Sequence, residues 1–300
     1  MLQLHGDVYD RRVPAGAHTT LRHDSALGQW EMTIAAPPAA LRAYVREYIG
    51  WFEHTATPFY RREPPSNEVP VVINLGAPVR IFESDDLRRW TDHDSFTTGS
   101  FDTYALVGTA GPSGGVQINF TILGARLFFG WPLADLTNRV VALEDVLGAD
   151  GRRLVSRLRD APSWETRFDI LDREIAARVA RSSEPSAAIA WAWRELVRTG
   201  GAARIGQLVE ASGWSRRHFI ARFREELGLP PKTLGRVLRF GRALAIMKTG
   251  RCDRLTDIAA ACGYSDQASF TRECSEFAGV SPRELATSLL PDRGGFLIDD

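Results

Sequence analysis

Apolar positions recur at every second residue in parts of the first 125 residues, which is the period of a half-buried β-strand. The clearest run alternates polar residues with Val116, Ile118, Phe120 and Ile122. Residues 71–75 and 79–82 are two further apolar runs, and the Gly76-Ala77-Pro78 turn between them predicts a hairpin. Residues 104–108 are another strand candidate, with a loop predicted over residues 111–115. The N-terminal part is therefore expected to be rich in β-strands.

Helical spacing replaces this alternation in three places. Pro37 and Pro38 precede Leu41, Tyr44, Val45 and Tyr48, which predicts a short helix inside the β-rich part. Residues 132–159 are predicted to be helical in pieces. Residues 164–181 predict a stronger helix, because its apolar residues form one stripe of Phe168, Leu171, Ile175 and Val179. The stripe is expected to pack on its own domain, and the alternative is that it forms a dimer contact. The polar stretch at residues 182–186 then breaks the pattern, so we place a domain boundary after residue 183.

The C-terminal third contains an internal repeat, which follows a helix predicted over residues 187–199. Residues 205–215 match residues 255–265 at an offset of 50. Each copy begins with apolar residues at positions i, i+3 and i+4 and ends on the pattern Ala-x-Gly-aromatic-Ser. The glycine supplies the left-handed backbone that ends a helix, and the serine is suited to cap the next one. A short helix, a tight glycine turn and a second helix make a helix-turn-helix unit.

The second helix of each copy continues the match at an offset of 51, so one extra residue follows the turn in the second copy. Gly228 and Pro231 pair with Gly279 and Pro282. A helix over residues 232–248 is expected to join the two units and fix their spacing. A helical bundle without a nucleic-acid role can contain one such pattern, but two matched copies favour tandem DNA-binding units.

Residues 202–287 resemble the DNA-binding domain of the AraC/XylS-type family of bacterial transcription regulators. The likeness is strongest from Gly263-Tyr264-Ser265-Asp266-Gln267 through Gly279-Val280-Ser281-Pro282, which is close to the family's signature. It implies two recognition helices in successive major grooves on one face of the duplex. Asn74-Leu75-Gly76 and Leu123-Gly124-Ala125-Arg126 are similar to the sensory half of one subgroup, which implies a cupin-like domain.

The resemblance and the exposed face of each second helix together give a set of residues expected to bind DNA. These are Ser215, Arg216, Arg217, Ile220, Arg222, Arg224, Ser265, Gln267, Ser269, Thr271 and Arg272. Arginine reads guanine or holds phosphate, glutamine reads adenine, and an apolar side chain meets a thymine methyl group. The family often has arginine at the position of Ala221, so Arg222 and Arg224 are expected to supply charge there. Base discrimination is therefore expected to rest mainly on the second unit.

The charge is zero overall but unevenly distributed, with 37 basic and 37 acidic residues. Residues 184–290 carry a net charge of +5, residues 1–183 of −3 and residues 291–300 of −2. A basic module joined to a mildly acidic partner suits nucleic-acid binding. The sequence has no long apolar run and no secretory signal, and its three cysteines form no CxxC pair. We therefore expect a cytoplasmic protein that does not cross a membrane.

Candidate catalytic and metal-binding residues are sparse. His5, His18, His23, His54 and His93 are scattered and never spaced as His-x-His, and no nucleophile-elbow or phosphate-loop sequence occurs in a convincing context. We expect no enzyme activity, no metal and no cofactor. The tryptophans that are candidates either for a ligand pocket or, more often, for the core are Trp30, Trp51, Trp90 and Trp131. Cys274 is expected to be a small buried hydrophobe.

The expected fold class is an α+β two-domain protein, with an N-terminal β-rich, cupin-like domain followed by an all-α domain with two helix-turn-helix units. The N-terminal domain covers residues 1–183, β-rich over 1–125 and helical over 132–181. The DNA-binding domain covers residues 184–290, and residues 291–300 form a tail.

The expected function is that of a sequence-specific DNA-binding transcription regulator whose N-terminal domain senses an effector or dimerises. Its expected partners are double-stranded DNA, a small-molecule effector, a second copy of the chain and RNA polymerase. Two alternatives stay open. One is a cupin-type enzyme fused to a DNA-binding domain, and the other is a regulator controlled by a protein partner instead of a small ligand.

Overall fold

The computed structural model describes residues 18–25, 28–55, 59–83, 87–109, 112–249, 254–289 and 296–298. Its strands are β1 (His18–Ser25), β2 (Gly28–Ala35), β3 (Val45–Thr55), β4 (Phe59–Glu63), β5 (Glu68–Asn74), β6 (Val79–Phe82), β7 (Trp90–His93), β8 (Phe96–Thr98), β9 (Ala105–Thr109), β10 (Ser113–Thr121), β11 (Val140–Ala142) and β12 (Phe296–Leu297). Its α-helices are α1 (Ile122–Phe129), α2 (Leu143–Leu147), α3 (Ala149–Asp160), α4 (Trp164–Arg181), α5 (Ala187–Arg198), α6 (Ile205–Ser212), α7 (Arg216–Leu227), α8 (Pro231–Thr249), α9 (Leu255–Ala261), α10 (Gln267–Ala278) and α11 (Pro282–Thr287). Two 3-10 turns are η1 (Ala39–Leu41) and η2 (Leu133–Leu136).

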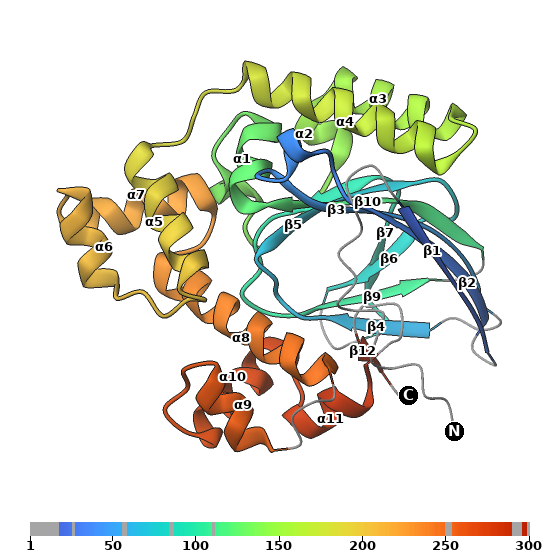
Figure 1. Ribbon diagram of the computed structural model, residues 1–300. Helices are drawn as coiled ribbons and strands as arrows, with labels where there is room; N and C mark the ends of the chain where they lie inside the picture. The colour runs from blue at the N-terminus through green and yellow to red at the C-terminus, as the bar shows by residue number, and fades with distance from the viewer. Residues whose placement is uncertain are drawn as a thin grey trace.

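The N-terminal half consists of two antiparallel sheets with helices on one side (Figure 1). The larger sheet has the strand order β1-β2-β3-β10-β5-β8-β11, and the smaller has the order β12-β4-β9-β6-β7. The last strand of the smaller sheet, β12, comes from the C-terminal end of the chain and pairs with β4. The expected combination of a β-rich part followed by an all-helical part is confirmed.

The predicted strand at residues 116–122 is confirmed as β10, but it is buried on both faces instead of half-buried, and Ile122 already begins α1. Val116, Ile118 and Phe120 lie in the main hydrophobic core, which includes residues of α1 and α4. The alternate residues Gln117 and Asn119 line a cavity between the sheets instead of facing the surrounding water. The alternation is thus real, but its polar face is enclosed.

The helix expected after Pro37 and Pro38 is also wrong, because only η1 is helical and β3 begins at Val45. The register of β3 on β10 shifts between Asn119 and Phe120, which is a β-bulge. Val45 and Tyr48 are three residues apart yet both are almost fully buried. The bulge therefore places two residues on one face at a spacing that imitates a helix.

Two turn predictions need correction as well. Residues 71–75 and 79–82 do not form a hairpin, because β5 belongs to the larger sheet and β6 to the smaller one. The turn between them links the two sheets. Residues 113–115 are not part of a loop but are the first residues of β10, paired with β3.

The helices α1 and α4 cover the outer face of the larger sheet (Figure 1). The ring of Phe168 in α4 stacks on Tyr48 of β3 with centroids 5.6 Å apart, and the Tyr48 hydroxyl donates a 2.6 Å hydrogen bond to Asp172. The helix predicted over residues 164–181 is confirmed and packs on its own domain. Residues 132–159 are helical in pieces, as expected, with the short strand β11 among them.

The helices from α5 onward divide between two hydrophobic cores. The main core continues from the larger sheet through α1 and η2 into α5, α6, α7 and the first half of α8. A second core holds the latter part of α8 together with α9, α10, α11 and Phe296 of β12. The first helix-turn-helix unit is therefore built onto the N-terminal domain, whereas the second has a core of its own. In the described part of the chain no helix combines the length and apolar character needed to cross a membrane.

Candidate nucleic-acid interface and ligand cavity

The first helix-turn-helix unit consists of α6 and α7. Gly213 ends α6 in the left-handed conformation, with φ of +69°. The Ser215 hydroxyl accepts a 3.3 Å hydrogen bond from the backbone N–H of His218, so it caps α7 as expected. Phe219 and Phe223 are fully buried and fix which side of α7 faces the core. The opposite side of α7 is left open to solvent.

The second unit consists of α9 and α10 and starts its second helix one residue later. Gly263 has φ of +78°, and the residue that caps α10 is Asp266, not Ser265. The Asp266 carboxylate accepts a 2.6 Å hydrogen bond from the backbone N–H of Ser269. This bond and the Ser269 hydroxyl hold the pKa of Asp266 below its ordinary value. The extra residue that separates the 50- and 51-residue offsets thus supplies the cap.

Three predicted DNA-binding arginines of α7 are exposed: Arg216, Arg217 and Arg224. In the part of the chain that the structure describes, their side chains have no hydrogen-bond or ion-pair partner. Arg217, Ala221 and Arg224 are spaced i, i+4 and i+7, so they lie on one face of the helix. This face carries two positive charges that no internal carboxylate neutralises.

Two other predicted residues of α7 are engaged within the protein. Arg222 donates hydrogen bonds to Glu225 at 2.7 Å and to Glu226 at 2.9 Å. Glu226 is buried and also accepts the backbone N–H of Ser186 at 2.9 Å, which joins α7 to the start of α5. Ile220 is half-buried and packs against the main core. Both side chains therefore contribute to the packing of α7 on its domain.

The predicted residues of α10 present a more polar surface. Gln267 is exposed at the first position of the helix, and Thr271 is half-buried one turn later. Arg272 is exposed and donates a 2.9 Å hydrogen bond to the Ser269 hydroxyl, which in turn lies 2.9 Å from the Ser265 hydroxyl. At the 51-residue offset Arg272 corresponds to Ala221, so the two units carry arginine at different turns of equivalent helices.

A buried ion cluster fixes α10 against α8. Glu273 is only 6% exposed and accepts hydrogen bonds from the Tyr264 hydroxyl at 2.7 Å and from Arg236 and Arg239, each at 2.8 Å. Burial, together with the bond to Glu273, raises the pKa of Tyr264. The sequence analysis did not select Glu273, although an acidic residue on the apolar side of a helix is the signal for such a cluster. Its equivalent in α7 is Arg222, so the two units use opposite charges at the same position.

The second unit is also fastened to the N-terminal domain. The Arg62 guanidinium of β4 donates a 2.8 Å hydrogen bond to the carbonyl oxygen of Ala278 at the end of α10 and lies 4.3 Å from the centre of the Tyr104 ring. Cations are favoured at helix C-termini. Phe296 of β12 is buried in the second core while its strand pairs with β4. The position of α10 is thereby linked to one strand of the smaller sheet.

A cavity of about 540 Å³ lies between the two sheets, within the range typical of small-molecule sites. Trp30 and Trp51 line it, whereas Trp90 is exposed and Trp131 packs against the main core. Part of the wall comes from the C-terminal half of the chain: Gly241, Leu244, Ala245 and Lys248 of α8, and Phe296 of β12. The same helix that joins the two helix-turn-helix units thus closes the cavity.

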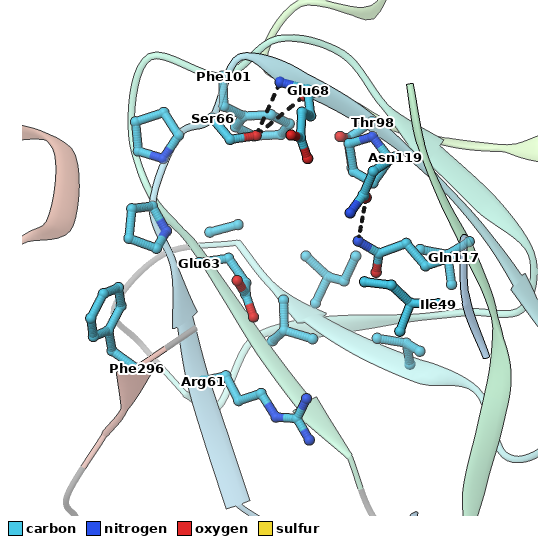
Figure 2. A pocket seen from close by; sticks show the side chains of 18 of the residues that line it. Ile49, Arg61, Glu63, Ser66, Glu68, Thr98, Phe101, Gln117, Asn119 and Phe296 are labelled. Carbon is cyan, nitrogen blue, oxygen red and sulfur yellow. Dashed lines mark hydrogen bonds between the residues drawn. The ribbon is translucent and has the colours of Figure 1, made fainter. Parts of the chain in front are cut away.

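One end of the cavity is rich in hydrogen-bond acceptors (Figure 2). Gln117 donates through its amide nitrogen to Asn119 at 2.7 Å, and Asn119 donates to Glu47 at 3.3 Å. Glu63 of β4 and Glu68 of β5 point into the same space (Figure 2). Each amide thus uses one of its two N–H groups within the wall, and the glutamates that line the same cavity come from three strands.

Histidines form no metal site in the described residues, where no three His, Cys, Asp or Glu side chains come together to hold a metal. His5 lies outside those residues. Cys274 is fully buried, as expected, and burial raises the pKa of its thiol to about 12.

Comparison with known proteins gives one clear family match. Residues 208–288 match a family described as a helix-turn-helix domain. The F1 operon positive regulatory protein of Yersinia pestis is 39% identical over 80 residues, which cover 27% of this chain and 26% of that protein. The likeness thus spans about a quarter of either protein.

Solved structures with a similar arrangement have low sequence identity. ToxT from Vibrio cholerae has a TM-score of 0.46 and 11% identity, covering 80% of this chain and 98% of its own. CuxR, described as an AraC-like transcriptional activator, has a TM-score of 0.31 and 16% identity, covering 77% of this chain and 95% of its own.

Proposed function

We propose, from the premise that the C-terminal module is an AraC-type helix-turn-helix domain, that this protein is a sequence-specific DNA-binding transcription regulator. The observation that carries the proposal is the pair of helix-turn-helix units, each with an exposed second helix that bears arginine. In such units the second helix enters the major groove and reads base edges from its exposed face. The two units are joined by α8, whose 19 residues span roughly 28 Å at 1.5 Å per residue. This length approaches one turn of B-DNA, about 34 Å, and favours binding in successive major grooves.

The two units would contribute differently to recognition. In α7, Arg216, Arg217 and Arg224 supply charge for guanine or phosphate. In α10, Gln267 and Arg272 supply hydrogen bonds suited to adenine and guanine. We assign weaker or indirect contributions to Ile220, Arg222, Ser215, Ser265 and Ser269. Packing, ion pairs, capping or hydrogen bonds within the protein already engage these side chains.

The N-terminal domain is proposed to sense a small-molecule effector in the cavity between the sheets. Support comes from the wall of that cavity, which includes α8 and Phe296 of β12. A molecule bound there would touch the element that sets the spacing of the recognition helices, so its binding free energy would be coupled to DNA affinity. Dimerisation and contact with RNA polymerase stay predictions. Control by a protein partner, the main alternative for the sensor, predicts no small-molecule effect on DNA affinity.

The proposal is tested by selecting bound DNA from a random pool with the purified chain. We expect an enriched motif with two half-sites about one helical turn apart. Arg217→Ala and Arg272→Ala should each weaken binding by about 1–3 kcal/mol if they read bases. Arg173→Ala is the matched control, since Arg173 is an exposed arginine on α4, outside both units. No enriched motif, or equal affinity of the three variants, would count against the proposal.

The salt dependence of binding separates the two roles of arginine. Replacing an arginine that contacts phosphate reduces the slope of log affinity against log salt by about one, and it does so for every DNA sequence. A base-reading residue relaxes the preference at one position of the motif. Measuring both quantities for Arg216→Ala and Arg224→Ala assigns each to one role.

A further inference from the structure

We propose that the cavity between the sheets binds an uncharged molecule with an apolar body and a carbonyl oxygen, and that the oxygen is held at the end where Arg61 of β4 meets Glu53 of β3. This inference rests on the proposed sensing function and names the chemical class of the effector. It is carried by two buried hydroxyls without partners, by charged lining residues that all have partners, and by an apolar wall.

Two hydroxyls in the cavity wall have no hydrogen-bond partner in the part of the chain that the structure describes. They belong to Thr109 at the end of β9 and Ser113 at the start of β10. Both residues are at least nine-tenths buried, with exposed fractions of 9% and 5%. Buried hydroxyls nearly always have a partner, because leaving one without a hydrogen bond costs free energy. Two such hydroxyls in one cavity therefore indicate a place where a ligand supplies the missing hydrogen bonds.

The strand register brings both hydroxyls to the same end of the cavity. Ser113 is directly opposite Glu53, and the Arg61 guanidinium is ion-paired with Glu53 from the other sheet. Arg61 is opposite Val107 of β9, which makes Thr109 its diagonal neighbour on the same face. The Cβ atoms of opposite residues are about 4.5–5.5 Å apart and those of diagonal neighbours about 7–8 Å. The two hydroxyls thus lie on either side of one ion pair.

The polar atoms at this end favour an acceptor on the ligand. The Arg61 guanidinium donates to Glu53 through Nη2, but its Nε atom is buried and has no acceptor in the described residues. An arginine nitrogen can only donate, whereas the hydroxyls of Thr109 and Ser113 can donate or accept. A carbonyl oxygen has two lone pairs, so it can accept from two of these groups without carrying a charge.

The charged side chains of the lining disfavour a charged ligand, because each of them already has a partner within the protein. They are Glu47, Glu53, Arg61, Glu63, Glu68 and Lys248. A carboxylate or an ammonium group would therefore be buried without an unpaired counter-charge, which is costly. The wall also includes Trp51, Val72, Phe96 and Phe296, which suit an apolar body.

The test uses three molecules with the same chain of eight carbons that differ only in the head group: octanamide, octanoate and octylammonium. Octanamide has nearly the shape of octanoate without its charge. Binding is measured by calorimetry and by the fluorescence of Trp30 and Trp51, which line the cavity. We expect octanamide to bind at least tenfold more tightly than the other two. Equal or tighter binding of either charged molecule, or no binding of any of the three, would overturn the proposed ligand class.

Variants of the full chain test the two hydroxyls. Thr109→Val combined with Ser113→Ala removes both and should weaken octanamide binding at least tenfold. Because neither hydroxyl has a partner to lose, the unliganded variant should unfold at the same temperature as the natural chain or at a higher one. The matched control is Thr98→Val, which removes a hydroxyl beside Asn119 in the same cavity (Figure 2) and should leave octanamide binding unchanged.

Three outcomes would refute the role of these hydroxyls. The first is unchanged octanamide affinity in the double variant, and the second is an equal loss of affinity in Thr98→Val. The third is a lower unfolding temperature of the unliganded double variant, which would show that the hydroxyls stabilise the fold itself.

DNA binding by the same samples separates this inference from the proposed function. If the selected DNA motif is still bound but octanamide is not, the ligand class is wrong and the regulator assignment stands. If no DNA motif is obtained, the regulator assignment itself fails, whatever octanamide does.

Discussion

Replacing Glu273 is expected to loosen the second helix-turn-helix unit more than any single change on its surface. Its carboxylate accepts four hydrogen bonds from three side chains, Tyr264, Arg236 and Arg239, and its own side chain is 7% exposed. Breaking a buried ion pair costs about 3–5 kcal/mol, and a buried hydroxyl left without a partner costs about 1–3 kcal/mol. Arg236 keeps its bonds to Glu276, which reduces the loss. We expect Glu273→Ala to destabilise the unit by about 3 kcal/mol.

Hydrogen exchange of the backbone amides in α9 and α10 measures this loss locally, which is preferable to whole-chain melting for a protein with two cores. A change of about 3 kcal/mol corresponds to roughly a hundredfold loss of protection. The control is Glu276→Ala, which removes a carboxylate that is 55% exposed from the same Arg236. An exposed pair contributes about 0–1 kcal/mol.

Comparing the amide protection of Glu273→Ala with that of Glu276→Ala tests whether the buried cluster orients α10. Glu273→Gln keeps an acceptor without the charge and should lie between the other two variants. DNA affinity of Glu273→Ala should fall while the salt slope stays the same, because Glu273 faces α8 and meets no phosphate. Protection in Glu273→Ala equal to that in Glu276→Ala would refute the reasoning.

Three further predictions follow from buried or bridging groups. Burial raises the pKa of Asp172 above the ordinary 3.8, so folding favours its protonated form and that stabilisation is lost as pH rises through the folded pKa. Asp172→Asn keeps an acceptor for Tyr48 but has no ionisable group. Its free energy of unfolding, measured by urea titration, should therefore rise relative to that of the natural chain between about pH 4 and 7. A difference between the two chains that does not change with pH would contradict this. Burial raises the thiol pKa of Cys262 and Cys274, so iodoacetamide followed by mass spectrometry should label both only after unfolding, and rapid labelling of the native chain would show the thiols to be accessible. Arg62→Ala removes the bond from β4 to the end of α10 and should raise amide exchange in α10 and not in α7, whereas equal changes in both would exclude a local fastening role.

The two helix-turn-helix units are attached to the rest of the protein in different ways. The first unit shares its hydrophobic core with the larger sheet, so α7 is held by the N-terminal domain itself. The second has its own core and reaches the N-terminal domain through Arg62 and β12. A ligand in the cavity would touch α8 and β12, the elements that lie between these two cores. Movement of the second unit relative to the first is the simplest way for such a ligand to change DNA affinity.

The sequence by itself determined the features whose signals are local. The repeat at offsets of 50 and 51 located both helix-turn-helix units, because helix ends, glycine turns and caps depend on neighbouring residues. The glycines at 213 and 263 take the left-handed conformation that this argument requires. The stripe on residues 164–181 likewise predicted α4, because its spacing of three and four residues fits one face of a helix.

Only the tertiary structure decided the features that depend on what lies opposite a residue. A bulge in β3 placed Val45 and Tyr48 on one face, and pairing between distant strands assigned β5 and β6 to different sheets. The polar positions Gln117 and Asn119 read as solvent-facing, yet the second sheet and α8 enclose them. The period of two shows that one face of the strand is apolar and the other polar. Which element packs against each face depends on contacts between residues far apart in the chain. The cavity and the link between α10 and β4 therefore depend on the tertiary structure, whereas the two helix-turn-helix units can be located from the order of the residues alone.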